Sequence, residues 1–213
     1  MKHITCWFDV ISPFAYLAFE QLPQALQGLS HRVDYRPVLF AGLLKHHGQL
    51  GPAEIETKRD WTCRQVLWLA HTHGIAMRMP ATHPFNPLPL LRLALACGSD
   101  GLANRYACET VFRHVWRGGE DAADATRLQA LQQHLQPSRD PSADEVKSQL
   151  RANTAAALAR GVFGVPTFEV DGKLFWGFDG LPMLRSCLAG DAWFESGAWE
   201  QARAIPSGTA RPR

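Results

Sequence analysis

The chain has no Cys-x-x-Cys pair, so it lacks the closely spaced thiols of a dithiol redox centre or of a paired-cysteine zinc site. Its five cysteines are an odd number and lie far apart, at Cys6, Cys63, Cys97, Cys108 and Cys187. This usage favours reduced thiols in the cytoplasm. The histidines do not fit the spacing of a closed metal site either, and we therefore expect no metal.

The sequence also has little net charge and no long apolar run. Its 22 Lys and Arg residues nearly balance 20 Asp and Glu residues, and the net charge of +2 gives no electrostatic basis for binding nucleic acid or a membrane. No stretch reaches the ~20 apolar residues of a membrane span, and the first residues do not form a signal peptide. With 213 residues, 46% of them hydrophobic, we expect a soluble cytoplasmic protein of one large domain, or of a domain with an insertion.

The N-terminal segment predicts a strand followed at once by a helix. Residues 3–10 are rich in strand-forming residues, and Ser12-Pro13 then opens a run with apolar residues at helical spacing. A serine hydroxyl and free backbone amides at the positive end of a helix suit an anion, such as a thiolate that a ligand supplies. The alternative is an ordinary helix start, since Ser at the N-cap before Pro is common.

A second informative segment lies at residues 161–180. It predicts a strand from Thr167, a turn at Asp171-Gly172 and a second strand over residues 173–176. The Val165-Pro166 pair ahead of this hairpin is typical of the thioredoxin-type cis-proline loop. If Pro166 is cis, the amide and carbonyl of Val165 face outward, where an extended thiol peptide can bind through backbone hydrogen bonds. The alternative is an ordinary edge-strand proline.

Between these segments the pattern is helical. A strand over residues 33–39 completes a strand-helix-strand unit, after which strand signals vanish. We predict an α/β fold with a discontinuous domain at 1–41 and 161–204, a helical insertion at 42–160 and a flexible tail at 205–213. The predicted helices cover residues 53–73, 88–97, 102–116, 124–135, 143–160, 179–188 and 191–204, with a capping box of Ser142 and Glu145 before the fifth.

This arrangement resembles the DsbA-like thioredoxin fold with its large helical insertion. The chain also resembles the 2-hydroxychromene-2-carboxylate isomerase family, which shares its fold with the kappa-class glutathione transferases. The segments that carry the resemblance are Phe8–Leu17, Arg36–Leu39 with Lys45, Gly51–Glu54 with Lys58 and Arg59, Pro84–Leu88, Gly161–Phe168, and Trp176–Gly177 with Asp179. They are collinear and span nearly the whole chain.

The resemblance implies a glutathione-dependent isomerase. Such an enzyme converts 2-hydroxychromene-2-carboxylate to trans-o-hydroxybenzylidenepyruvate, or acts on a related intermediate in the breakdown of naphthalene-like aromatics. The glutathione thiolate attacks the substrate reversibly and leaves without net transfer. The resemblance further implies a homodimer and a small aromatic-acid substrate.

The resemblance also implies roles for individual residues. Ser12 would hydrogen-bond the thiolate and lower its pKa, and Val165 before Pro166 would pair with the cysteinyl part of glutathione. Asp179 would accept the γ-glutamyl ammonium, while Lys45 and Asn86 would contact ligand or substrate. Two positions depart from the family pattern: Gln49 replaces the usual Asn of the glutathione site, and Gly180 replaces a common Arg.

Two other functions stay open at this point. A kappa-like glutathione transferase would use the same Ser12 and Pro166 but would leave the thiol on its product. A non-catalytic thioredoxin-fold protein would bind glutathione or a peptide without turnover. In that case Ser12→Ala would cost only the capping energy of about 1 kcal/mol.

Overall fold

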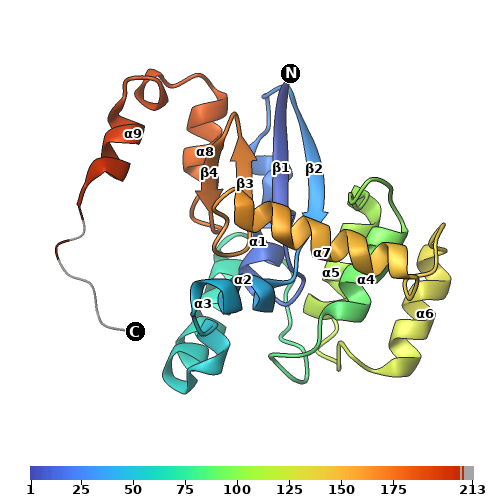
Figure 1. The fold of residues 1–213 in the computed structure, drawn as a ribbon. Helices are drawn as coiled ribbons and strands as arrows, with labels where there is room; N and C mark the ends of the chain where they lie inside the picture. The colour runs from blue at the N-terminus through green and yellow to red at the C-terminus, as the bar shows by residue number, and fades with distance from the viewer. Residues whose placement is uncertain (207, 209–213) are drawn as a thin grey trace.

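A four-stranded sheet forms the centre of the fold. The structure is a computed structural model that describes residues 1–206 and residue 208. Its strands follow the order β2-β1-β3-β4, with β1 parallel to β2 and β3 antiparallel to both β1 and β4 (Figure 1). The strands are β1 (Lys2–Phe8), β2 (His31–Pro37), β3 (Thr167–Val170) and β4 (Lys173–Trp176). This confirms the predicted strand-helix-strand opening and the closing hairpin.

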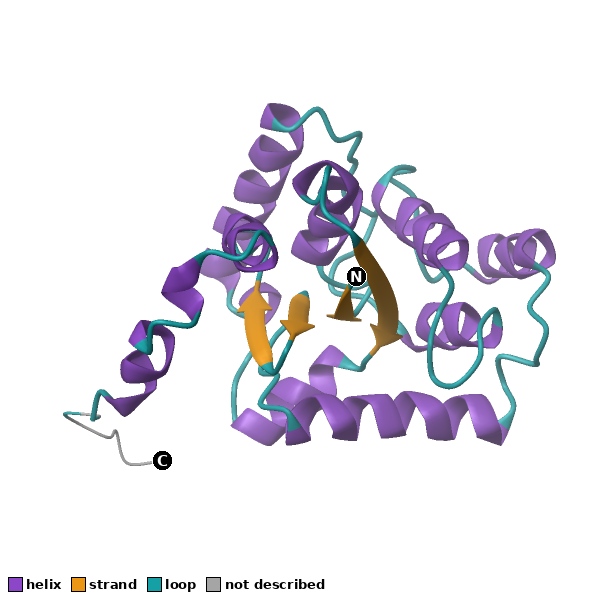
Figure 2. Ribbon diagram, turned by 90° about the horizontal axis from the view of Figure 1, so that it is seen from above, coloured by secondary structure: helices purple, strands orange, loops and turns teal. Residues whose placement is uncertain are grey.

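Helices cover both faces of the sheet. The helix α1 (Pro13–Ala25) lies on one face and α7 (Asp144–Ala159) crosses the other (Figure 2). On the α1 side, the larger apolar core joins strand residues such as Phe8 to Phe112 and Trp116 of α5 (Arg105–Trp116). On the α7 side, a smaller core includes Trp7, Val38, Leu43, Ala157, Val162 and Val165. Apolar cores thus lie on both faces of the sheet and hold its central strands in place.

The segment between β2 and β3 is helical, as predicted. Besides α5 and α7, it contains α2 (Phe40–His47), the 3₁₀ turn η1 (Pro52–Glu54), α3 (Glu56–Thr72), α4 (Leu88–Ala96) and α6 (Ala125–Leu135). The predicted helices begin only at residue 53 and thus omit α2, whose last turn contains Lys45. The sequence hides this helix because its N-cap, Leu39, forms no side-chain cap.

Two further details of the predicted helices are wrong. Helix α7 begins after Ala143 without a side-chain cap, because the Ser142 hydroxyl donates to the Asp140 carboxylate instead of capping the helix. The predicted helix over residues 191–204 is broken at Gly197, whose φ of +83° lies in the left-handed region. After α8 (Leu181–Leu188), this part of the chain consists of η2 (Ala192–Phe194), α9 (Ala198–Gln201) and η3 (Ala202–Ala204).

The larger core contains residues from both the predicted discontinuous domain and the predicted helical insertion. The division of the chain into these two domains at residues 41 and 161 stays a proposal. The predicted tail over residues 205–213 falls largely outside the described residues. None of the helices in the described part of the chain has the length and apolar character needed to cross a membrane.

Candidate functional site

Four predicted site segments meet at one end of the sheet. Ser12 follows β1, and α2 follows the parallel strand β2 at the same end. Because β3 runs antiparallel to β1, the residues before β3 also lie at this end, together with those after β4 (Figure 1). The topology therefore brings Ser12, Val165 and the segments bearing Lys45 and Asp179 to the same end of the sheet.

Ser12 is buried at the start of α1, with 8% of its surface exposed. Its hydroxyl oxygen accepts a hydrogen bond from the Ala15 amide at 3.2 Å, which caps the helix. The same hydroxyl donates to the Val165 carbonyl at 3.2 Å. The structure thus brings Ser12 and Val165 into direct contact, although 153 residues separate them in the sequence.

The Val165–Pro166 peptide bond is cis. The Pro166 carbonyl accepts from the Gly177 amide at 2.9 Å, which fastens the loop to the end of β4. The Val165 amide has no acceptor among the described residues, and neither has the Phe14 amide in the first turn of α1. Two backbone donors without an acceptor among the described residues thus belong to the two segments that meet at the Ser12 hydroxyl, an arrangement suited to an anionic or peptide-like ligand.

The turn formed by residues 9–12, here called the Ser12 turn, contains a buried carboxyl group. Asp9 has no exposed surface, and its carboxylate accepts from the amides of Ile11 at 3.0 Å and Phe40 at 2.8 Å. Burial raises the pKa of Asp9 to about 7, against the opposing effect of the backbone N–H donors. Asp9 is not among the predicted site residues, because its signal in the sequence is no more than an acidic residue at the end of an apolar strand.

His83 also contacts the Ser12 turn. It precedes Pro84 across a second cis peptide bond, which the sequence analysis did not predict. Its Nε2 lies 2.9 Å from the Ile11 carbonyl; because a carbonyl only accepts, Nε2 carries the proton. Nδ1 is buried without a partner among the described residues, and burial lowers the pKa of the ring. His83 is therefore a neutral donor that holds the turn.

The remaining predicted residues are exposed: Lys45, Gln49, Asn86 and Asp179, here called the rim. Asn86 accepts from the Leu88 amide at 3.1 Å, which supports the turn before α4. Asp179 does not cap α8, because the N-cap is Gly180. Within the part of the chain that the structure describes, no hydrogen bond or ion pair joins the rim to Ser12.

Two exposed rings stand next to the Val165 loop. Phe163 is 41% exposed and Trp176 is 54% exposed, and their ring centroids lie 5.0 Å apart. The indole of Trp176 packs on Gly164, where an added Cβ would approach Nε1 to 2.6 Å. This aromatic pair, which is not among the predicted site residues, is thus fixed against the backbone just before Val165.

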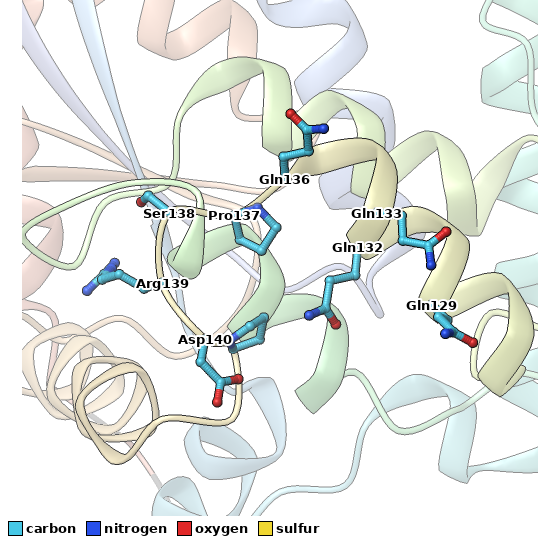
Figure 3. A pocket seen from close by; sticks show the side chains of 9 residues that line it. Gln129, Gln132, Gln133, Gln136, Pro137, Ser138, Arg139 and Asp140 are labelled. Carbon is cyan, nitrogen blue, oxygen red and sulfur yellow. The ribbon is translucent and has the colours of Figure 1, made fainter.

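A hollow of about 680 Å³ lies elsewhere, between α6 and the loop that follows it (Figure 3). It is lined by Gln129, Gln132, Gln133, Gln136, Pro137, Ser138, Arg139, Asp140 and Pro141, which include none of the predicted site residues. The charge of Arg139 is already engaged by the carbonyls of Leu95 and Gly98 and by Glu145. The chemistry of the site therefore points to Ser12 rather than to this hollow.

Residues 3–189 match the family model of the DSBA-like thioredoxin domain. The chain belongs to this family. It is similar to a 2-hydroxychromene-2-carboxylate isomerase from Pseudomonas putida, with 30% identity over 190 residues that cover 85% of this chain and 92% of the relative. It is also similar to glutathione S-transferase kappa 1 from Rattus norvegicus, with 27% identity over 209 residues, 88% of this chain and 90% of the relative.

A solved structure of a 2-hydroxychromene-2-carboxylate isomerase has the same fold. The two structures superpose with a TM-score of 0.76 at 24% sequence identity. The superposition covers 96% of this chain and 100% of the chain of the solved structure. These comparisons confirm the DsbA-like fold and the family resemblance. They leave the roles of the individual residues as predictions.

Proposed function

We propose that the protein is a glutathione-dependent isomerase that converts 2-hydroxychromene-2-carboxylate to trans-o-hydroxybenzylidenepyruvate, or acts on a closely related aromatic intermediate. The observation that carries this proposal is the contact between the Ser12 hydroxyl, at the start of α1, and the Val165 carbonyl. Relatives named as 2-hydroxychromene-2-carboxylate isomerases support it. The five free cysteines fit the reducing cytoplasm in which glutathione is abundant.

The residues present fit a peptide-like thiol. The unpaired Val165 amide and the Val165 carbonyl offer a donor and an acceptor to the cysteinyl backbone of glutathione. The Phe14 amide and the positive end of α1 favour a negative sulfur over a neutral one. Bound glutathione supplies a thiolate nucleophile that adds to the substrate reversibly and leaves without net transfer.

Ser12 must change its partner when this ligand binds. A hydroxyl has one proton to donate, and in the free protein it goes to the Val165 carbonyl. In the complex the Ser12 proton turns to the sulfur, and the Val165 carbonyl accepts from the cysteinyl N–H instead. Because each donor replaces another, the exchange leaves no buried group unpaired. The hydroxyl then lowers the pKa of the thiol from its free value of ~8.5 toward neutrality.

The rim and the aromatic pair complete the site in this proposal. Asp179 accepts the γ-glutamyl ammonium of glutathione, and Gln49 and Asn86 provide further polar contacts. Lys45 holds the carboxylate of the second substrate by opposite charge. The rings of Phe163 and Trp176 take the aromatic ring of that substrate, since they are exposed and lie beside the thiol-binding loop. We further propose a homodimer, as the family resemblance implies.

The test is an ultraviolet-absorbance assay of 2-hydroxychromene-2-carboxylate conversion with and without glutathione. Wild type is compared with Ser12→Ala and with the matched control Ser186→Ala, whose hydroxyl contacts Asp191 on another part of the chain. We expect conversion that needs glutathione, is lost in Ser12→Ala and is retained in Ser186→Ala. Conversion that is independent of glutathione would contradict the proposal.

A kappa-like glutathione transferase is the second candidate, because similar proteins carry that name. Glutathione binding without isomerisation, together with a stable glutathione conjugate of an aryl halide, would favour it. Binding without either reaction would favour a non-catalytic glutathione- or peptide-binding protein.

A further inference from the structure

Asp9 lies where the Ser12 turn meets the start of α2. One carboxylate oxygen accepts from the Ile11 amide at 3.0 Å and the other from the Phe40 amide at 2.8 Å. Phe40 is the first residue of α2, whose own N-cap residue forms no side-chain cap. Asp9 therefore supplies the missing acceptor for α2 from 31 residues away in the sequence, while it also holds the turn that presents Ser12.

We propose that Asp9 is a positioning residue that fixes the Ser12 turn against α2, and that its charge is coupled to the charge of the thiol bound at Ser12. The second part rests on the proposed function, because the thiol is that of glutathione. Asp9 acts through its neighbours, since the Ser12 amide donates to the Asp9 carbonyl at 3.2 Å and Ile11 links the two residues. A displaced Asp9 side chain would therefore displace the Ser12 hydroxyl.

No ionisable side chain forms an ion pair or hydrogen bond with Asp9 among residues 1–206 and 208. The charged groups on the surrounding elements have other partners or are exposed: Glu20 of α1 binds Arg113 and Arg117, Arg36 of β2 binds Asn153, Glu169 of β3 binds Arg160, His83 binds the Ile11 carbonyl, and Lys45 of α2 is exposed. The Asp9 carboxylate thus lacks a counter-ion and has only backbone donors.

The absence of a counter-ion makes Asp9 sensitive to a second negative charge nearby. Burial raises the pKa of Asp9 to about 7, so this carboxyl titrates in the range where a thiol stabilised by Ser12 would also ionise. Two like charges in a poorly solvated region oppose each other, and the effect is reciprocal. Bound thiolate should therefore raise the pKa of Asp9, and ionised Asp9 should raise the pKa of the thiol.

The positioning role is tested without any ligand, by following the amide protons of Ile11 and Phe40 in the full chain by nuclear magnetic resonance between pH 5 and pH 9. We expect both amides to titrate with one shared midpoint in wild type, and neither to do so in Asp9→Asn. The matched control is Glu169→Gln, because Glu169 is another buried carboxylate of the sheet but binds Trp7 and Arg160. Two different midpoints, or none, in wild type would overturn the positioning role.

The charge coupling is tested by repeating the titration with saturating glutathione and with S-methylglutathione, which has no ionisable thiol. We expect glutathione to raise the shared midpoint by roughly 0.5 pH unit, about a threefold change in the ionisation constant, and S-methylglutathione to leave it unchanged. Equal midpoints with the two ligands would overturn the coupling. If neither ligand shifts the resonances of Ser12 and Val165, the coupling and the proposed function both fail, while the ligand-free titration still decides the positioning role.

Discussion

The Ser12 turn and the rim lie at the same end of the sheet but are held in different ways. In the turn, the Val10 carbonyl accepts from Trp116, the Ile11 carbonyl from His83, and both oxygens of Asp9 accept from backbone amides. The rim residues are exposed, and within the described residues none of them forms a hydrogen bond or ion pair with the turn. The difference teaches that the fold fixes the groups proposed for chemistry in advance, whereas the groups proposed for recognition acquire their geometry from the ligand.

The largest expected effect comes from breaking the centre of the turn. Ser12→Ala removes the hydroxyl proposed to stabilise the thiolate, and we expect kcat/KM to fall by about 100- to 1,000-fold, as for the loss of one oxyanion donor. Loss of the cap on α1 should lower the free energy of unfolding by only about 1 kcal/mol. Steady-state kinetics and urea denaturation of the same samples separate the two effects. An unfolding loss without a kinetic loss would reduce Ser12 to a structural role.

The second prediction concerns the pH dependence of the turn. Because the folded state raises the pKa of Asp9 to about 7, folded protein binds this proton more tightly than unfolded protein does. The stability that Asp9 contributes is therefore complete below about pH 4, the ordinary range of an aspartate, and declines as the pH rises to about 7. Relative to Asp9→Asn, the wild type should lose up to about 1.4 kcal/mol of unfolding free energy per pH unit across this window. Urea midpoints from pH 4 to pH 8 test this, and parallel curves for the two proteins would refute it.

A smaller effect is expected at the aromatic pair. Trp176→Ala removes an exposed ring that packs on Gly164, and we expect the KM for the aromatic acid to rise about tenfold while the affinity for glutathione stays unchanged. Trp193→Ala is a matched control, since Trp193 is 47% exposed but packs on the C-terminal rings of Phe194 and Trp199. Equal kinetic effects of the two substitutions would remove Trp176 from the proposed site.

The smallest effects belong to the rim. Asp179→Asn should weaken glutathione binding about threefold and Lys45→Ala should raise the KM of the aromatic acid by a similar factor, because exposed ionic contacts contribute roughly 0.2–1 kcal/mol. Both losses should shrink as salt is added. Isothermal titration with glutathione measures the first effect and steady-state kinetics with the aromatic acid measure the second, each at low and at high ionic strength. A rim substitution with an effect as large as that of Ser12→Ala would abolish the contrast between the rim and the turn.

The sequence predicted what depends on local signals. The strand before Ser12, the helix after it and the hairpin after Pro166 can each be predicted from a few adjacent residues. The structure contains all three. Helix α2 was missed because its acceptor is Asp9 rather than a neighbouring cap residue. The role of His83 was missed because its partner, Ile11, is 72 residues away. Hydrogen bonds between residues 31 or 72 positions apart form only when the chain folds, so a prediction from short sequence segments does not find them.

The partner exchange proposed at Ser12 also bears on which thiols the site would accept. A simple alkyl thiol such as ethanethiol would draw the hydroxyl of Ser12 away and offer no hydrogen-bond donor in return. The Val165 carbonyl, in a residue only 6% exposed, would then be left without a donor at a cost of about 1–3 kcal/mol. A thiol that carries a hydrogen-bond donor on the carbon next to its sulfur-bearing carbon, such as the cysteinyl N–H of glutathione, avoids this penalty. If the proposed exchange occurs, the hydrogen bond between Ser12 and Val165 acts as a filter against thiols that carry no such donor.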